Sequence, residues 1–408
     1  MPRVGSWPGS QQRVSLCGLF VMHKRMIQPS GSSIKVFPVH DAPSRMEEDN
    51  LLGLPFQQIE YLQHLAQSNP SMDHYICQVF NEGKLMARAY LQSMAFQGNR
   101  LDNFRPKIFF ARIIYNAFVR PIRWRIVSLG SIFTTGDNGL VFFDNLSQEN
   151  KLIIYHFLLG HLRDGLIPYD GLLVKDIYVE RDSWMKNSLI GLGFQLTPSE
   201  PDMILDHLQR FDSPEDYKSS LRAKYRTKFN QVVERSKSLQ VDDYQKWHEA
   251  PRDIMYPLYV NIMSSVDFYI QLASPSYLTM DIPSDIVRPR LRTYSIHGEV
   301  IGWISWFEDE YRIHAHLIGL NHKLAAPYKA YQRILYDLVL EGIRLRKDKV
   351  CFGRTSQQAK SNVGARPIGM VSAVYHKNFL VRSLMRRLIG SIALDTEVIR
   401  HAFREKNG

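Results

Sequence analysis

The chain has 408 residues, of which 45% are hydrophobic and 22% charged, so it has the balance of a globular protein able to bury a large core. Its 51 lysines and arginines outnumber 40 acidic residues, and the net charge of +11 favours anionic partners: phosphates, nucleic acid or an acidic membrane leaflet. The cysteines, Cys17, Cys77 and Cys351, lie far apart, which argues against a disulfide framework or a structural zinc site and fits a reducing cytoplasm.

The N-terminal segment differs in composition from the rest of the chain. Val14–Met22 is apolar but shorter than the roughly 18 residues of a membrane span, and it lacks the small-residue cleavage site of a signal peptide. We expect residues 1–50 to be a leader, either disordered or ahead of a true start at Met22 or Met26 rather than Met1. The expected location is cytoplasmic, with peripheral contact at the inner face of a membrane left open.

Residues 51–211 have the pattern of a mixed α/β unit. Beta-rich runs flank a turn-type cluster at Asn81–Lys84, which predicts a hairpin, and two more such runs surround Gly136–Gly139. The next segments are predicted to be a helix, a buried strand, a short helix, the start of a strand and a last strand, at Glu149–Arg163, Gly171–Val179, Ser183–Leu192, Gly193–Leu196 and Pro201–Leu208.

Residues 212–285 are predicted to be a basic helical connector. Asp212 or Ser213 is the expected N-cap, Pro214 takes the first helical position, and the helix is predicted to continue to Lys237. Lysine and arginine alternate there with aromatic residues. That pattern is typical of a surface for tRNA or phospholipid headgroups, and equally of a solvated face whose aromatic residues enter the core.

Residues 286–375 return to the mixed pattern. Arg292–Leu320 contains β-rich runs with two hairpin-like joints, Tyr328–Arg346 is an amphipathic helix, and Lys349–Phe352 is a strand. Both halves of the chain therefore share the order hairpin, further strand, helix, strand. This repetition predicts a duplicated α/β unit.

Several segments between Leu51 and Met370 form a recognisable series. They are a helix-to-strand Gly-Phe junction, a Leu-x-x-Lys-Tyr-Arg helix and a strand-helix-strand core, at Leu189–Phe194, Asp216–Gln231, His314–Ile343 and Phe352–Ala365. In this order they resemble the tandem branch of the GNAT acyltransferase superfamily that includes the Fem-like enzymes. The resemblance implies an α/β fold of two tandem GNAT-like domains with mixed sheets, at 51–211 and 286–375, joined by the connector and followed by a tail at 376–408.

The resemblance also implies a function. It implies transfer of an acyl group from acyl-CoA, a co-substrate rather than a bound cofactor, to an amine on a small molecule, a lipid or a cell-envelope precursor. The family's best-known CoA signature (Gln or Arg, two residues, Gly, one residue, Gly or Ala) is absent from both halves, and the equivalent place reads Gly319–Gln332. Tyr331 at that helix start, with Lys323 and Lys329 nearby, is the candidate for phosphate binding.

Two other functions remain open because of this departure. One is a Fem-like transferase that uses aminoacyl-tRNA and acts on peptidoglycan precursors. The other is a catalytically silent GNAT-fold module that docks to an anionic membrane or to nucleic acid. Strong salt dependence of RNA binding would favour the first, and tolerance of histidine substitutions would favour the second.

A pair of histidines is the candidate catalytic group. On a regular strand His314 and His316 share one face with Ile318, while the intervening residues face the other way. Two imidazoles side by side are able to act as general base for an attacking amine, with His316 accepting the proton and His314 assisting. The alternative is a pair of satisfied core or edge histidines. No third ligand stands at a metal-binding spacing, so no metal site is expected.

Polar residues follow the last predicted strand. Arg354, Thr355 and Lys360 come after Cys351, and ligands of open α/β sheets bind beyond the carboxyl ends of strands. A guanidinium there is able to bind a carboxylate or phosphate, although it is equally able to bridge a loop to a carbonyl. Gly364 indicates a close backbone approach.

Three further groups complete the candidates. Asp176, with Lys175, is a charge inside an apolar strand and is expected to find partners across the domain interface. Lys224, Tyr225 and Arg226 are implied as substrate-binding residues by the resemblance. In the tail, a leucine stripe with arginines beside it predicts a basic amphipathic helix that lies on an anionic membrane or packs on its own domain: Leu380, Leu384, Leu388, Arg382, Arg386 and Arg387.

Overall fold

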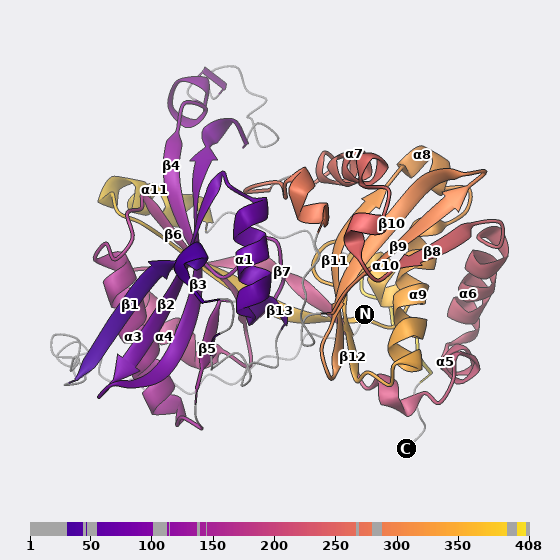
Figure 1. Ribbon diagram of the computed structural model, residues 1–408, viewed down its shortest axis with the longest axis horizontal. Helices are drawn as coiled ribbons and strands as arrows, with labels where there is room; N and C mark the ends of the chain where they lie inside the picture. Colours follow the sequence, from indigo (N-terminus) through magenta and orange to yellow (C-terminus); the bar gives the residue numbers. More distant parts are fainter. Residues whose placement is uncertain are drawn as a thin grey trace, which may run out of the picture.

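The computed structural model describes residues 31–43, 46, 55–100, 112–113, 115–136, 139–143, 145–266, 269–279, 288–389 and 398–404. Within these residues a mixed sheet of 13 strands runs through both halves of the molecule, with helices on its faces (Figure 1). The predicted α/β class is confirmed.

The first half contains seven strands and three α-helices in the described residues. Its strands are β1 (Ser32–Pro38), β2 (Met72–Asn81), β3 (Lys84–Gln97), β4 (Arg123–Leu129), β5 (Leu140–Phe142), β6 (Gly171–Tyr178) and β7 (Gln195–Leu205). Its helices are α1 (Ile59–Ser68), α3 (Gln148–Arg163) and α4 (Ser183–Gly191).

Two features of this half differ from expectation. Part of the expected leader is ordered, because β1 pairs with β2 along its whole length. The two strand pieces expected after Leu192 are one continuous strand, β7. The predicted hairpin of β2 and β3 is confirmed, and its turn at Glu82 and Gly83 has positive φ at both residues, as a two-residue hairpin turn requires.

The second half includes the predicted connector. Its strands are β8 (Gln240–Tyr244), β9 (Arg288–Ile296), β10 (Glu299–Glu308), β11 (Arg312–Leu320), β12 (Lys349–Cys351) and β13 (Arg366–His376). Its helices are α5 (Pro214–Ser220), α6 (Ala223–Arg235), α7 (Arg252–Met263), α8 (His322–Ala325), α9 (Ala330–Arg344), α10 (Gln357–Asn362) and α11 (Phe379–Ile389).

The connector helix is interrupted. Ser213 caps α5 by accepting a hydrogen bond from the Asp216 amide at 3.1 Å, as expected, but the helix ends at Ser220. Leu221 is extended because its backbone forms a β-bridge to Phe403 of the tail. The prediction of one helix to Lys237 is therefore wrong, and α6 begins at Ala223.

The two halves exchange strands. β13, from the C-terminal part of the chain, lies between β6 and β7 and pairs antiparallel with both, while β7 pairs with β12 of the second half. Figure 1 shows the consequence: α11, at the end of the chain, lies against the half built from the beginning of the chain. No strand is predicted over 366–376, because Pro367 and Gly369 weaken the strand pattern there.

A shared core fixes the halves further. Buried residues of α1, among them Tyr61 and Leu62, pack in one cluster with Trp247, Trp303 and Phe307 of the second half. Burying each such aromatic side chain contributes roughly 1.5–3 kcal/mol by area. The halves are therefore joined by apolar packing as well as by backbone pairing.

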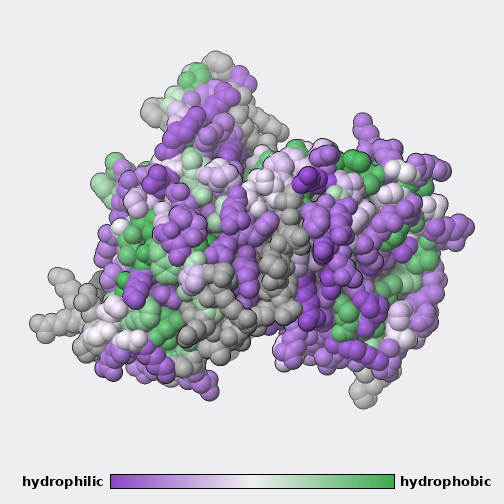
Figure 2. Space-filling view, viewed as in Figure 1, coloured by the Kyte–Doolittle hydropathy of each residue, from purple (hydrophilic) through white to green (hydrophobic). Residues whose placement is uncertain are grey.

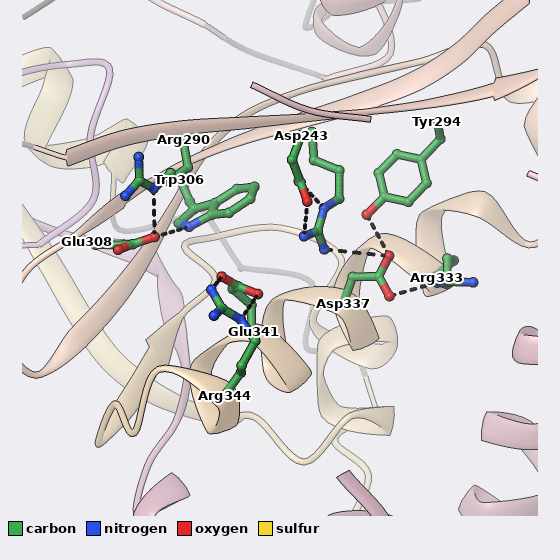
Figure 3. Close-up of polar contacts among 10 residues, drawn as sticks. Asp243, Arg290, Tyr294, Trp306, Glu308, Arg333, Asp337, Glu341 and Arg344 are labelled. Carbon is green, nitrogen blue, oxygen red and sulfur yellow. Dashed lines mark hydrogen bonds and ion pairs between the residues drawn. The ribbon is translucent and has the colours of Figure 1, made fainter. Parts of the chain in front are cut away.

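A polar network holds α9 against the sheet (Figure 3). Asp337, only 6% exposed, accepts hydrogen bonds from Tyr294 at 2.9 Å and from Arg333 at 2.7 Å. Arg292 binds Asp243 of β8 through two hydrogen bonds of 2.6 and 2.9 Å. Because its carboxylate is paired, Asp337 does not pay the full cost of burial, and α9 is fixed in place beside β11.

Candidate active site

A gap between two strands forms a pocket at the centre of the molecule. β11 and β12 pair in parallel only from Arg312 and Lys349 to His314 and Cys351. β11 then continues beside β10, while β12 ends, and a pocket of about 160 Å³ opens where they part. Both halves line it: Phe56, Phe133, Thr134, Thr135 and Asp202 from the first, and His314, Ala315, His316, Ile318, Tyr331, Phe352, Arg354, Thr355 and Lys360 among those from the second.

A β-bulge shapes one wall of this pocket. Ile304 pairs with Ile318 but Trp306 pairs with Ala315, so Ser305 stands opposite two residues, His316 and Leu317. The Ser305 hydroxyl accepts a hydrogen bond from the Leu317 amide at 3.1 Å and donates one to the Leu317 carbonyl at 3.3 Å. A strand that bulges in this way re-aims the side chains that follow.

The bulge corrects the expected alternation of side chains. Ile313, Ala315 and Leu317 were expected on one face and Ile318 on the other. Instead Ile318 packs with Ile313 and Ala315 in the core beneath α9, while Leu317 packs with the aromatic cluster around α1. His314 and His316 both face the pocket, as expected.

His314 is oriented by a carboxylate. Its Nε2 lies 2.7 Å from Asp309 Oδ2, and Asp309 Oδ1 accepts hydrogen bonds from the amides of Tyr311 and Arg312 at 2.8 and 2.7 Å. Burial would raise the pKa of Asp309, but the hydrogen bonds from His314 and the backbone outweigh it and lower that pKa. Asp309 is therefore ionised opposite the His314 ring and is able to stabilise an imidazolium.

His316 has a different environment. Its Nε2 lies 2.7 Å from the hydroxyl of Tyr277, in the turn Pro275–Thr279, and that hydroxyl lies 2.9 Å from the hydroxyl of Tyr61. Burial, together with the neighbouring His314, lowers the pKa of His316 to about 3. His316 is therefore neutral near pH 7 and ends a buried chain of two tyrosine hydroxyls.

Arg354 joins the pocket to the first half. It forms an ion pair with Asp176 of β6, which also pairs with Lys175 and accepts a hydrogen bond from the Gly136 amide at 3.0 Å. The expected pairing of Asp176 across the halves is thus present. Asp176 has φ of 59°, a strained backbone for a residue with a side chain, and such strain is often found at functional sites.

Lys360 supports the loop after β12. Its ammonium donates hydrogen bonds to the carbonyls of Gly353, at 3.1 Å, and Arg354. Thr355 lies on the same loop with φ of 63° and lines the pocket, and Tyr331 reaches the pocket from the first turn of α9. Lys360 thus bridges the loop to backbone carbonyls. This is the structural role that was the alternative to ligand binding for Arg354.

Asp176 and four other expected site residues do not themselves line this pocket. Gly364 has φ of 98°, and a Cβ built there would overlap the ring of Phe403, so this glycine makes room for the tail. Lys224, Tyr225 and Arg226 lie on α6. Tyr225 is in the core, and Arg226 contacts the Leu221 carbonyl at 3.4 Å.

Asp202 and Tyr277 line or contact the site but were not among the predicted residues. Asp202, on β7, is 2% exposed and lines the pocket. Burial raises its pKa, although the hydroxyl of Tyr178, 2.8 Å away, acts in the opposite direction. A carboxylate beside the apolar residues of β7 is the same signal that drew attention to Asp176. No signal marks Tyr277.

The fold is similar to that of solved structures, although no sequence family matches. No family model and no curated protein matches the sequence. Among solved structures, FemX matches with a TM-score of 0.51 and 11% identity, over 81% of this chain and 94% of that chain. The protein has a GNAT-like fold.

Other solved structures align less closely with this GNAT-like fold. A tandem GNAT protein from the clavulanic acid biosynthesis pathway has 10% identity and a TM-score of 0.44, over 85% of this chain and 99% of that chain. The C-terminal domain of a putative lysylphosphatidylglycerol synthetase from Agrobacterium fabrum has 9% identity and a TM-score of 0.39, over 66% of this chain and 84% of that chain.

Proposed function

We propose that the protein is an N-acyltransferase that moves an acyl group from a thioester to an amine at the gap between β11 and β12. The observation that carries this proposal is the parting of these strands directly beyond His314, at the bulge of β11. A strand edge released from its neighbour presents backbone N–H donors, which are suited to the oxyanion that forms when an amine attacks a carbonyl.

His314 is the proposed proton acceptor, with His316 in a supporting role. The amine nitrogen attacks the thioester carbon, the carbon–sulfur bond breaks, the thiolate leaves, and a proton passes from nitrogen to His314. Asp309 is placed to stabilise the resulting imidazolium. This reverses the order expected from the sequence, because the lowered pKa of His316 makes it a weak base.

The donor is proposed to be acyl-CoA, used as a co-substrate, and the acceptor an amine on a small molecule or on a lipid or cell-envelope precursor. Arg354 and Tyr331, which both line the pocket, are the groups proposed to bind an anionic part of donor or acceptor. The pocket is smaller than the several hundred Å³ of a typical ligand site, so it suits the reacting end rather than a whole CoA.

Ligand-dependent thermal stability tests this proposal. Wild type is compared with Arg354→Ala, and with Arg346→Ala as a matched control on an exposed arginine, in CoA, acetyl-CoA, palmitoyl-CoA and bulk aminoacyl-tRNA. We expect an acyl-CoA to raise the melting temperature of wild type and of the control but not of Arg354→Ala. An unchanged melting temperature of wild type with every thioester would refute the proposal.

An aminoacyl-tRNA-dependent transferase is the second candidate. The observation that favours it is the solvent-facing basic side of α6, where Lys224 is exposed and Arg226 half-buried. Stabilisation by aminoacyl-tRNA alone, weakening steeply as salt rises, would support this candidate over acyl-CoA.

Peripheral contact with an anionic membrane is a further part of the proposal. Phe379, Leu380 and Leu384 of α11 are 67%, 63% and 56% exposed, and Arg382 and Arg386 lie beside them. In Figure 2 apolar residues reach the surface in the region of α11, on a face that is otherwise largely polar. The side chains of Arg387 and Leu388 lie outside the described part. No helix in the described residues is long and apolar enough to cross a membrane.

Vesicle sedimentation tests the membrane contact. We expect the protein to bind vesicles that contain phosphatidylglycerol more than vesicles of phosphatidylcholine alone, because arginines are attracted to anionic lipid. A variant with Leu380→Ser and Leu384→Ser should lose this binding. Leu324→Ser, at a 37% exposed leucine on α8, is the control. Equal binding by all three proteins would contradict the contact.

A further inference from the structure

Asp202 contributes a carboxylate to the pocket from the opposite half of the molecule. It lies on β7, at the point where that strand runs between β13 and β12, and its neighbour Met203 accepts a hydrogen bond from the Phe352 amide at 2.9 Å. Asp202 therefore enters the pocket wall only because the halves exchange strands. It is the one carboxylate among the described residues that line the pocket.

One oxygen of this buried carboxylate has no hydrogen-bond partner. Oδ2 accepts a hydrogen bond from Tyr178 at 2.8 Å, and the Gly353 amide also interacts with this carboxylate. Oδ1 is buried and has no partner in hydrogen-bond geometry in the described part of the chain. Each of the two cations that line the pocket has another partner, although the charge of Lys360 also acts on Asp202 and lowers its pKa. Arg354 forms its ion pair with Asp176, and Lys360 donates to the carbonyls beside it.

A buried carboxylate with an unused oxygen is costly unless something binds it. The cost of a buried unsatisfied polar group is about 1–3 kcal/mol, and more when the group is charged. A cation brought by a ligand would offset that cost. The pocket of about 160 Å³ has the volume of about five water molecules, enough for an alkylammonium group but not for a large polycation.

We propose that Asp202 is a binding subsite for a primary ammonium ion, with an N–H of the ligand donating to Oδ1. The inference rests on the proposed function, in which that ammonium is the acceptor of the acyl group. Such an acceptor has one proton too many to attack. It transfers that proton to Asp202, which becomes a neutral carboxylic acid, and the neutral amine then attacks the thioester carbon. The second proton leaves for His314 as the carbon–sulfur bond breaks.

Calorimetric titration with a charged and an uncharged probe tests the subsite. The probes are n-butylammonium chloride and n-butanol, which share shape and differ in charge, with sodium chloride at equal ionic strength as reference. We expect wild type to bind the ammonium at least about tenfold more tightly than the alcohol, a difference of about 1.4 kcal/mol. Equal binding of the two probes, or binding of neither, in wild type overturns the subsite and needs no variant.

The variant Asp202→Asn then locates the effect. It should bind n-butylammonium no better than n-butanol, while Asp206→Asn, at a carboxylate 42% exposed, should behave as wild type. Retention of the preference in Asp202→Asn overturns the assignment to Asp202.

Failure of the proposed function gives a different result. Asp202→Asn is expected to keep its stabilisation by acyl-CoA, because it leaves Arg354 and the β11 edge in place. Loss of ammonium preference with acyl-CoA binding intact supports the subsite as stated. Ammonium preference at Asp202 in a protein that binds no acyl-CoA would leave the subsite standing and remove the acyl-transfer reaction from it.

Discussion

The partly buried, neutral ring of His316 makes the stability of the protein depend on pH. Its pKa is lowered from 6.5 to about 3, so between these values the unfolded chain binds a proton that the folded protein does not. Stability therefore falls as the pH falls through that window. We predict that His316→Gln weakens this fall, measured as urea midpoints from pH 7 to pH 4. His74, whose pKa is lowered to about 4, keeps part of the slope in both proteins. An unchanged slope would contradict the account.

The proposed role of His314 differs from that of His316. His314 is the proton acceptor, because the ionised Asp309 beside it is placed to stabilise the imidazolium. Removing a general base typically costs roughly 10²–10⁴-fold in rate. We predict a loss of that order in acyl transfer, followed as thiol release from acyl-CoA, for His314→Ala. His322→Ala, at an exposed histidine on α8, should retain the wild-type rate. Equal rates for both variants would show that His314 is not the proton acceptor.

At the scale of single residues, the sequence predicted which side chains line the pocket better than it predicted the hydrogen-bond partners of those side chains. His314, His316, Arg354 and Thr355 all line one pocket, as their positions at and after strands suggested. The pattern did not separate the two histidines, because the difference arises from Asp309 and Tyr277, which are brought near by a hairpin joint and a distant turn. Asp202 was missed for a related reason, since only strand exchange places it there.

A close approach was expected at Gly364 as part of the site, whereas the group that approaches it is the ring of Phe403 in the tail. Its positive φ and the ring of Phe403 together exclude a side chain. We predict that Gly364→Ala lowers the free energy of unfolding by roughly 2–5 kcal/mol, from about 1–2 for the left-handed backbone and about 1–3 for overpacking. Gly298→Ala, which has φ of 79° and nothing within 4 Å of its Cβ, should show the backbone part alone. Equal losses in chemical denaturation would contradict the packing role.

Most helices and strands could be predicted because their patterns are local. The β2–β3 hairpin, α3, α9 and the N-cap of α5 follow from turn residues, helical spacing and capping. The break at Leu221 and the strand β13 could not be predicted, since both depend on pairing with segments far away in the sequence. The bulge in β11 is set by its partner strand β10 and has no signature in its own residues.

At the scale of the whole molecule, strand exchange makes the two halves one folding unit. β13 completes the sheet of the first half, and Tyr61 shares a core with Trp303. We predict a single unfolding transition in urea, with tryptophan fluorescence and far-ultraviolet circular dichroism giving the same midpoint. Two separated transitions would show that each half is stable alone. The duplicated order of elements was visible in the sequence, whereas the exchange was not.

The central claim is that the acyl donor binds where β11 and β12 part. Hydrogen–deuterium exchange with and without palmitoyl-CoA tests it most directly, because exchange slows where a ligand covers or orders backbone amides. The account predicts slower exchange in 312–320 and 350–356, with 223–235 of α6 unchanged. Protection confined to other segments, or none at saturating palmitoyl-CoA, would contradict the claim that this gap is an acyl-transfer site.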